Sequence, residues 1–373
     1  MMRRSLPLAV ASILLLTSCA AESEPRSTPS SAPSTPAAAG ALQPVGEPTV
    51  LATGLAAPWS IVRLGTSDSS LISERDSGTV VERLPSGSLR HAGVVPGVVH
   101  AGEGGLLGIA VHQESTSAKR WLYAYLTTAT DNRVLRMPLT GASGSYRLGA
   151  ATPILTGLAK AQNHDGGRIA FGPDGMLYAT VGDAGKPSRA QDPASLNGKI
   201  LRMTPTGAVP RDNPTTGSLV YSLGHRNSQG IAWDADGQLW ASEFGQNTWD
   251  EFNRIEPGGN YGWPIVEGIG SKSGFVDPLY QWPTSDASPS GLAFVGGTFF
   301  LAALRGERLW AISPGATTTA LPFLTGSLGR LRDAVPGPDG SLWLLTNNTD
   351  GRGSPTAGDD KLVEVRLDVS RAG

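Results

Sequence analysis

A histidine in a dense polar phrase is the residue of this chain best suited to acid–base chemistry. His164 lies in Gln162–Arg168 and directly precedes an apolar stretch with a Pro-Asp-Gly turn, Ile169–Thr180. Of the five histidines, His225 is the other one in such a phrase, Gly224–Gly230. An imidazole titrates near neutral pH and can accept a proton from a ligand beside it. We expect His164 to act as a base on a loop of an all-β scaffold, although a lone histidine beside a strand is often structural.

Further polar phrases recur along the chain and would share one pocket if their loops met. They contain arginines, carboxylates and two aromatic rings, and they are Gly102–Gly108, Gly224–Asn227, Glu243–Glu251, Asn260–Pro264, Leu304–Gly306 and Arg330–Asp333. Propellers bring such loops together at one mouth of a central channel. The phrases therefore favour a single ligand site.

A weak internal repeat predicts the scaffold that must position these loops. A turn followed by an alternating strand with an aromatic residue recurs in Gly172–Ala179, Asp234–Ala241 and Gly337–Leu344. Weaker copies are Ser70–Glu74, Arg120–Tyr125 and Gly297–Ala302. Six copies over roughly 320 residues give about fifty residues each, the length of a four-stranded blade. We predict an all-β, six-bladed β-propeller rather than a pair of β-sandwiches, which would have no reason to repeat six times.

The two ends of the domain are expected to close the ring. Thr49–Leu55 would supply an outer strand beside Lys361–Leu367, which protects edges that would otherwise be exposed. Apolar residues follow period two, and the 48 glycines and 28 prolines are spread along the chain as turn residues. Helical periodicity is nearly absent.

Charge excludes some partners. The formal net charge is −2, so no basic field favours nucleic acid and no polybasic face suggests binding to a bilayer surface. We expect small or neutral ligands.

The N-terminus is predicted to be a targeting segment. Arg3 and Arg4 precede the apolar run Leu6–Leu16, which is too short to span a membrane and suits a signal peptide. Leu16–Cys19 resembles the bacterial lipobox, and Cys19, the one cysteine of the chain, would carry the lipid. No disulfide can form within the chain, so packing must supply its stability.

The expected domain organisation follows from these signals. Residues 1–18 would be a lipoprotein signal peptide, and residues 19–45, rich in Ser, Pro and Ala, a lipid-anchored linker. Residues 46–370 would form the propeller. The protein would then lie outside the cytoplasm at the cell envelope, contacting the membrane through its lipid alone.

The ordered phrases resemble those of the soluble PQQ-dependent aldose sugar dehydrogenases, also called the glucose/sorbosone dehydrogenase family. The resemblance covers the whole expected domain and rests on Gly54–Ser60, Gly104–Leu107, His164–Arg168, Leu196–Arg202, Gly224–Asn227, Asn260–Pro264 and Arg330–Asp333. Their common order is more specific than any one phrase. The resemblance implies a six-bladed propeller that oxidises aldose sugars to lactones and passes electrons to an external acceptor.

The resemblance also implies a role for individual residues. His164 corresponds to the family's base, which removes the anomeric hydroxyl proton as a hydride leaves for the quinone of PQQ. Arg226 and Asn227 would lie near the quinone oxygens. Because PQQ carries three carboxylates, cationic groups must bind it, and these would be Arg305, Arg330 and Arg332.

A calcium ion joins cofactor and protein in that family, through backbone carbonyls of a Gly-Pro pair. The matching pair here is Gly245–Gln246, and carbonyl ligation survives the change of side chain. Nearby Asp250 and Glu251 would bind water on the ion or orient substrate, although solvated loop charges would look the same. Tyr261 and Trp263 match positions near the pocket, where aromatic faces pack against a sugar or the cofactor, although core aromatics would look the same.

Three positions depart from the best-known members. Glu103 replaces a glutamine, Asn163 an aspartate and Arg305 a lysine. Glu103 and Asn163 remain candidate cofactor contacts. A carboxylate close to an anionic cofactor opposes binding unless it is protonated or paired with an arginine.

Two other functions stay open from the sequence. One is a calcium-dependent lactonase like the gluconolactonases, which place acidic and asparagine side chains on the metal; no clear set of them is found here. The other is a binding propeller without catalysis, as the hedgehog-interacting proteins resemble this family. The chemistry of the site has to decide between these functions.

Overall fold

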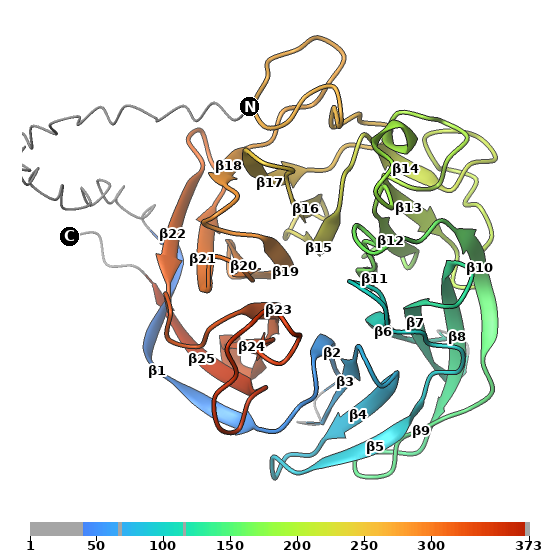
Figure 1. Cartoon of the computed structure of the whole chain (residues 1–373). Coiled ribbons are helices and arrows are strands. Elements are labelled where there is room, and N and C mark those ends of the chain that lie inside the picture. The colour runs from blue at the N-terminus through green and yellow to red at the C-terminus, as the bar shows by residue number, and fades with distance from the viewer. Residues whose placement is uncertain (1–39, 66–68, 115–116, 370–373) are drawn as a thin grey trace, which may run out of the picture. The chain divides into compact units, whose positions relative to one another are not determined.

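Six four-stranded antiparallel units are arranged in a ring (Figure 1). The computed structural model describes residues 40–65, 69–114 and 117–369. In this part of the chain, helical structure is limited to two 3₁₀ turns, Pro187–Ala190 and Pro338–Gly340. The predicted six-bladed β-propeller is confirmed.

Each blade runs from an inner strand beside the channel to an outer strand at the rim. The first comprises β2 (Pro58–Arg63), β3 (Ser70–Glu74), β4 (Thr79–Arg83) and β5 (Leu89–Val94). The second comprises β6 (Leu106–Gln113), β7 (Arg120–Thr127), β8 (Asn132–Thr140) and β10 (Thr152–Leu158), with β9 (Arg147–Leu148) also paired to β8. The third comprises β11 (Ile169–Phe171), β12 (Leu177–Val181), β13 (Lys199–Met203) and β14 (Val220–Leu223).

The remaining blades follow the same order. The fourth comprises β15 (Ser228–Trp233), β16 (Leu239–Glu243), β17 (Trp249–Arg254) and β18 (Tyr280–Pro283). The fifth comprises β19 (Pro289–Val295), β20 (Thr298–Ala303), β21 (Arg308–Ser313) and β22 (Thr319–Phe323). The sixth comprises β23 (Leu331–Pro336), β24 (Leu342–Thr346), β25 (Leu362–Val369) and β1 (Leu42–Ala52).

The internal repeat marks one position in every blade. All six copies contain or overlap the second strand of a blade, which is β3, β7, β12, β16, β20 or β24. These strands are buried on both sides, since their residues pack against the blades before and after. Burial on both faces explains why the second strand keeps the clearest apolar and aromatic signature.

The first strand closes the ring, as predicted. β1 pairs antiparallel with β25, with Thr49 opposite Glu364 and Val50 opposite Val363. The pairing extends to Leu42 opposite Val369, so β1 begins within the segment assigned above to the linker. The predicted signal peptide, Cys19 and most of that linker lie outside the described residues. Among the described residues, no helix is long and apolar enough to cross a bilayer.

Candidate functional site

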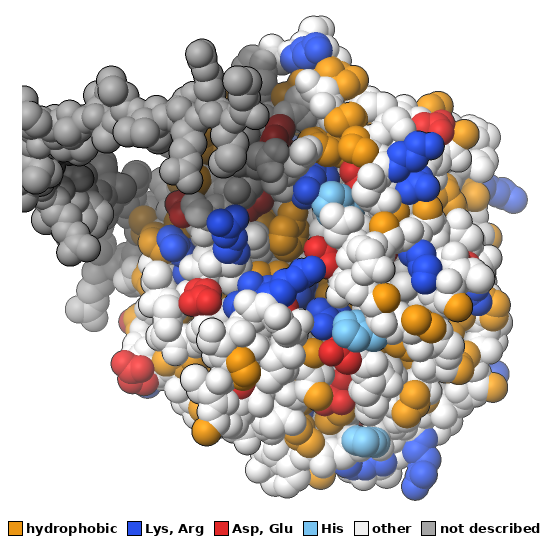
Figure 2. Space-filling view, viewed as in Figure 1, with side chains coloured by type: hydrophobic (Ala, Val, Ile, Leu, Met, Phe, Trp, Pro, Cys, Tyr) orange, Lys and Arg blue, Asp and Glu red, His pale blue; other side chains and the backbone are white. Residues whose placement is uncertain are grey.

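Two classes of loop open onto the same face of the ring and line a cavity of about 380 Å³. One class leads into the inner strands, which run away from this face, and the other joins the second strand of a blade to the third. The cavity is lined by Trp59, Arg75, Glu103, Asn163, His164, Arg226, Asn227, Gln229, Phe244, Gly245, Gln246, Asp250, Thr284, Ser288, Leu304, Arg305, Arg330, Arg332 and Arg352. Figure 2 shows cationic side chains gathered at the centre of this face. We call this cavity the arginine-lined cavity.

His164 lies on the loop that leads into β11 and is held from behind by Asp183. Nδ1 of His164 lies 2.8 Å from Oδ1 of Asp183, and the imidazole is 12% exposed. The other carboxylate oxygen, Oδ2, accepts a hydrogen bond of 2.9 Å from the indole of Trp263. Asp183 follows β12 and is fully buried.

The charge on Asp183 fixes the tautomer of the histidine. Burial by itself raises the pKa of this carboxyl, but hydrogen bonds from His164, Trp263 and Gly185 outweigh burial and hold the pKa below its usual value. An ionised carboxylate can only accept, so Nδ1 of His164 carries the proton. Nε2 is then the basic nitrogen, and the Asn163 amide, 3.3 Å away, can donate to it.

The backbone around His164 is tightly constrained. His164 has a φ of 60°, in the left-handed region, and its N–H donates to Oε2 of Glu103 at 2.9 Å. Two residues on, the Gly166 N–H donates to Oδ1 of Asn227 at 3.0 Å. A Cβ on Gly182 would lie 2.0 Å from the His164 carbonyl oxygen, so a larger residue beneath the loop would displace it. The sequence therefore fixes where the imidazole points.

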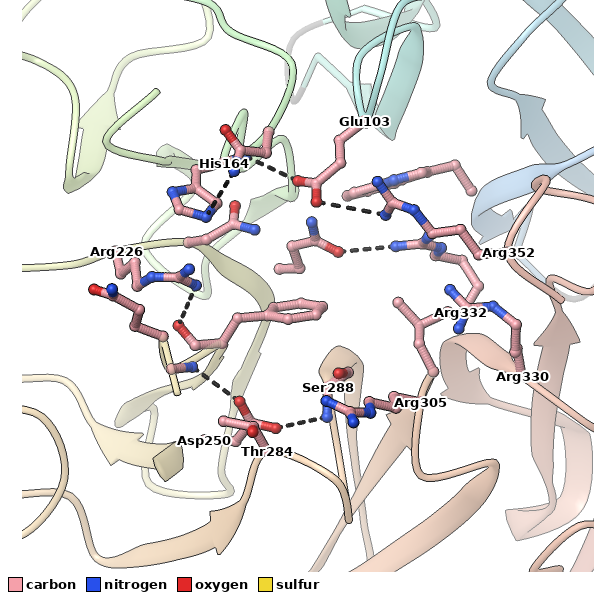
Figure 3. Close-up of a pocket in the computed structure, with 18 of the residues that line it drawn as sticks. Glu103, His164, Arg226, Asp250, Thr284, Ser288, Arg305, Arg330, Arg332 and Arg352 are labelled. Atoms are coloured by element: carbon pink, nitrogen blue, oxygen red, sulfur yellow. Dashed lines mark hydrogen bonds and ion pairs between the residues drawn. The ribbon is translucent and has the colours of Figure 1, made fainter. Parts of the chain in front are cut away.

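Arginines line the opposite wall (Figure 3). Arg330 and Arg332 are buried, and both approach Oδ2 of Asp350, at 3.0 and 3.8 Å. The Nε atoms of both arginines are buried, and no residue of the described ranges is hydrogen-bonded to them. Burial lowers the pKa of Arg332; Asp350 opposes this effect, and Arg330, Arg75 and Arg168 add to it. The wall thus holds more positive charge than one carboxylate can balance.

A buried network positions Arg226 and Asn227. The Glu243 carboxylate accepts hydrogen bonds from both their N–H groups, from Ser228 Oγ and from Nδ1 of His225. His225 is fully buried, so it supports this loop and cannot reach a ligand. The side chain of Arg226 donates to the Phe244 carbonyl, and its Nε has no hydrogen-bond partner in the part of the chain that the structure describes.

Two arginines at the rim are more accessible. Arg352 is 51% exposed and lies 3.5 Å from Oε1 of Glu103. Arg305 is exposed, and no hydrogen bond or ion pair joins it to another residue of the described part of the chain. The expected arginine partner of Glu103 is therefore Arg352.

The loop after β16 brings backbone oxygens to the cavity. Asp250, which is 1% exposed, accepts from the Gly245 N–H at 2.9 Å and from the Ser288 N–H at 2.6 Å. Burial raises its pKa to about 6. Across the described residues, the carbonyl oxygens of Gly245 and Gln246 accept no hydrogen bond. They are free to bind a ligand.

Most of the predicted site residues meet in this cavity. It brings together Glu103, Asn163, His164, Arg226, Asn227, Gly245, Gln246, Asp250, Arg305, Arg330 and Arg332. Tyr261 and Trp263 do not line it. Tyr261 is buried against His225 and donates its hydroxyl to the Arg254 carbonyl, while Trp263 packs below Arg226 and donates to Asp183. Their rings support the site from beneath.

Several residues that line the cavity or support it were missed from sequence. Arg75 and Arg352 lie on loops after the second strands of their blades, and Gln229 lies within β15. Asp183 was missed because Val181–Gly185 looks like an ordinary turn after a strand. The sequence did hold one signal that Asp183 lies near the site. This residue follows the repeat copy Gly172–Ala179, at the point where the chain returns to the cavity face.

Residues 55–355 of the chain match a family model described as glucose/sorbosone dehydrogenase. The chain belongs to this family. The chain is similar to the quinoprotein glucose dehydrogenase B of Acinetobacter calcoaceticus, with 34% identity over 252 residues that cover 58% of this chain and 52% of that protein. The aldose sugar dehydrogenase YliI of Escherichia coli is 29% identical over 339 residues, which cover 81% of this chain and 90% of that protein.

Solved structures agree with the family. The PQQ-bound aldose sugar dehydrogenase from Streptomyces coelicolor superposes with a TM-score of 0.83 and 48% sequence identity, over 90% of this chain and 100% of that one. Because the relatives and the solved structure named here are sugar dehydrogenases, this family member is an oxidoreductase.

Proposed function

We propose that this protein oxidises aldose sugars to lactones with PQQ as the electron acceptor in its site. The observation that carries the proposal is the His164–Asp183 pair, held on one wall of a cavity whose other wall is made of arginines. A base and an anion-binding wall that face one another suit a sugar hydroxyl beside a polyanionic cofactor.

The cavity residues fit PQQ. Three of the lining arginines, Arg226, Arg330 and Arg332, have a buried Nε without a partner, and Arg305 has no partner among the described residues. Unpaired buried donors are costly, so they favour a ligand with several carboxylates. These four residues would hold the carboxylates and oxygens of PQQ. When bound, PQQ supplies the quinone that accepts the hydride.

Calcium fits the loop after β16. The free carbonyl oxygens of Gly245 and Gln246 are hard ligands of the kind that this ion prefers. Over the described residues, no cluster of three or more His, Cys, Asp or Glu side chains could hold a metal alone. Two carbonyls do not complete a calcium shell, so we infer that oxygens of the cofactor and water would supply the rest.

His164 would remove the proton of the anomeric hydroxyl through Nε2. Asp183 keeps Nδ1 protonated and faces it with a negative charge, which stabilises the imidazolium that proton transfer creates. Asn163 lies beside Nε2 and can donate to a sugar oxygen, because its amide is at the cavity surface. The anomeric carbon would lose its hydrogen as a hydride to the quinone, and the anomeric C–O bond would become the lactone carbonyl.

The partners follow from this chemistry. The substrate is an aldose of small size, and an external acceptor must reoxidise the cofactor. We propose, from the N-terminal motif, that Cys19 carries a lipid that anchors the enzyme to the extracytoplasmic face of the cell membrane.

The test is reconstitution of the purified full chain. PQQ and calcium are added separately and together, dye reduction is followed with a panel of aldoses, and the sugar product is identified by NMR. We expect turnover that needs both additions and yields lactone. His164→Ala should lose activity and retain PQQ binding, whereas His91→Ala, an exposed position on β5, should behave as the wild type.

The alternatives give different results in the same assay. Hydrolysis of a lactone with calcium alone would indicate a lactonase. Saturable sugar binding without dye reduction, even with PQQ bound, would indicate a binding propeller. Either result would overturn the proposal.

A further inference from the structure

Glu267 binds the backbone of the loop after β16, which carries the two free carbonyls. It belongs to the segment between β17 and β18 and is not among the residues that line the arginine-lined cavity. Its Oε1 accepts from four consecutive backbone N–H groups, at 2.7, 3.1, 3.1 and 3.3 Å, which are those of Gln246, Asn247, Thr248 and Trp249. Successive N–H groups that converge on one point form an anion-binding nest, and here the chain supplies its own anion.

Peptide geometry links these N–H groups to the carbonyls. The peptide bonds after Gly245 and Gln246 are trans, and in a planar trans peptide the N–H and the C=O point in opposite directions. Because the N–H groups of Gln246 and Asn247 point at Glu267, the carbonyls of Gly245 and Gln246 point away from it. Gly245 and Gln246 line the cavity and Glu267 does not, so the direction away from Glu267 is that of the cavity.

The position of Glu267 is itself fixed by β17. The N–H of the next residue, Gly268, donates to Oε1 of Glu251 at 2.7 Å, and Glu251 is 8% exposed on that strand. Gly268 has a φ of 75°, and a Cβ there would lie 2.5 Å from Oε1 of Gln281 and 2.6 Å from the ring of Trp249. The close approach of this segment to β17 therefore favours glycine beside Glu267.

The charge of Glu267 acts through the same peptides. Burial by itself raises the pKa of this carboxyl, but the four N–H groups outweigh burial and hold the pKa below its usual value. An N–H that donates to an anion polarises its peptide group, which makes the oxygen at the other end more negative. The contact thus directs two carbonyl oxygens and also strengthens them as ligands for a hard cation.

We propose that Glu267 is a positioning residue for the calcium ion of the site. It acts by directing the carbonyls of Gly245 and Gln246 toward the cavity, and it contacts neither the ion nor the cofactor. The inference rests on the proposed function, which requires calcium, and adds to it a residue outside the cavity that sets the calcium concentration needed for PQQ binding.

The first test measures binding rather than turnover. The purified full chain is freed of calcium with EGTA, calcium is titrated at a fixed PQQ concentration, and bound PQQ is measured by equilibrium dialysis. Glu267→Ala removes the acceptor and should raise the half-saturating calcium concentration at least about ten-fold. Glu267→Gln keeps an oxygen acceptor but loses the charge, and it should raise that concentration about three-fold.

Asp277→Ala is the matched control. This partly buried carboxylate lies on the same segment and accepts from the N–H groups of Gly270 and Ser271, which are outside the loop after β16. The control should bind PQQ at the wild-type calcium concentration. A calcium requirement raised equally by Asp277→Ala and Glu267→Ala would reduce Glu267 to a general support of its segment and overturn the inference.

Hydrogen exchange separates this inference from the proposed function. Without PQQ and calcium, the amides of residues 246–249 should exchange at least about ten-fold faster in Glu267→Ala than in the wild type, with the melting temperature within about 4 °C. Wild-type exchange in this variant, or an unchanged calcium requirement, would overturn the inference and leave the proposed function intact. Calcium-independent PQQ binding by the wild type would overturn the role of calcium and this inference together.

Discussion

Asp183 holds His164 through Nδ1 at 2.8 Å and leaves Nε2 on the side of the cavity. The two residues come from different loops of one blade region, before β11 and after β12, so the antiparallel pairing of these strands sets their distance. Asp183 thus orients the base His164. The fold fixes the tautomer of His164, because it places the ionised carboxylate of Asp183 against Nδ1.

Asp183→Asn should therefore abolish most turnover without loss of PQQ binding. An asparagine amide in this place can donate to Nδ1, which moves the imidazole proton to Nε2 and removes the base. We expect kcat to fall by about 10²- to 10⁴-fold, with PQQ affinity within about three-fold of the wild type. Asp192→Asn, an exposed carboxylate nearby in sequence, is the matched control. Unchanged kcat would contradict the assignment of His164.

Arg332→Met should separate stability from function. The guanidinium is buried beside Arg330 with an unpaired Nε, so its removal relieves repulsion in the protein without cofactor, and Arg330 still pairs with Asp350. We expect a higher melting temperature without PQQ and at least about ten-fold weaker PQQ binding. Differential scanning fluorimetry and a PQQ titration measure the two effects. Arg308→Met, beside Trp310 and outside the cavity, should change neither the binding nor the cavity's repulsion.

Asp165→Asn should flatten the pH dependence of stability. Burial raises the pKa of this carboxyl to about 6, and its Oδ2 has no hydrogen-bond partner among the described residues. The folded wild type thus binds more protons here than the unfolded chain between about pH 4 and pH 6, so its free energy of unfolding falls as pH rises through that window. The variant should lack this fall, which amounts to at most about 3 kcal/mol. Urea unfolding at several pH values measures it, with exposed Asp339→Asn as control; parallel curves would refute the effect.

Gly182→Ala should disturb catalysis more than folding. Its Cβ would meet the carbonyl of His164, so the loop must shift by an ångström or more, whereas a Cβ on Gly315 meets nothing closer than 3.5 Å. We expect kcat to fall by at least about ten-fold in Gly182→Ala and to be unchanged in Gly315→Ala, because misplacing a base strongly affects proton transfer. Equal kcat in both variants would show that the loop tolerates the shift.

The calcium concentration needed for PQQ binding should depend on the backbone carbonyls of Gly245 and Gln246 and not on the Gln246 side chain. Gln246→Ala keeps its carbonyl and should need the same calcium concentration for PQQ binding. Asp250→Asn replaces an acceptor of the Gly245 or Ser288 N–H with a donor, which loosens the loop. It should need at least about ten-fold more calcium. A titration after removal with EGTA compares them, and the reverse order would exclude carbonyl ligation.

The six-bladed scaffold was predictable from the repeat. The second strand of each blade is buried on both faces, so it has a recognisable apolar and aromatic pattern, and the clearest copies also have a turn before it. His164, Arg226 and Arg330 were predictable because they stand in compact polar phrases directly before inner strands. Asp183, Arg75 and Arg352 were not, since single polar residues after a strand look like any turn, and only the ring brings them together. Tyr261 and Trp263 were placed at the ligand because an aromatic side chain looks the same from sequence in a wall and in the layer beneath it.

The antiparallel pairing of β1 with β25 has a consequence for how the molecule comes apart. Because β1 and β25 join the two ends of the chain in one blade, no terminal blade can unfold before the others. Unfolding of any one blade would open the ring, and the loops at both ends of the channel would lose the contacts that hold them. Melting should therefore be a single cooperative event, and a chain shortened beyond residue 52 should lose its active geometry before it loses its strands.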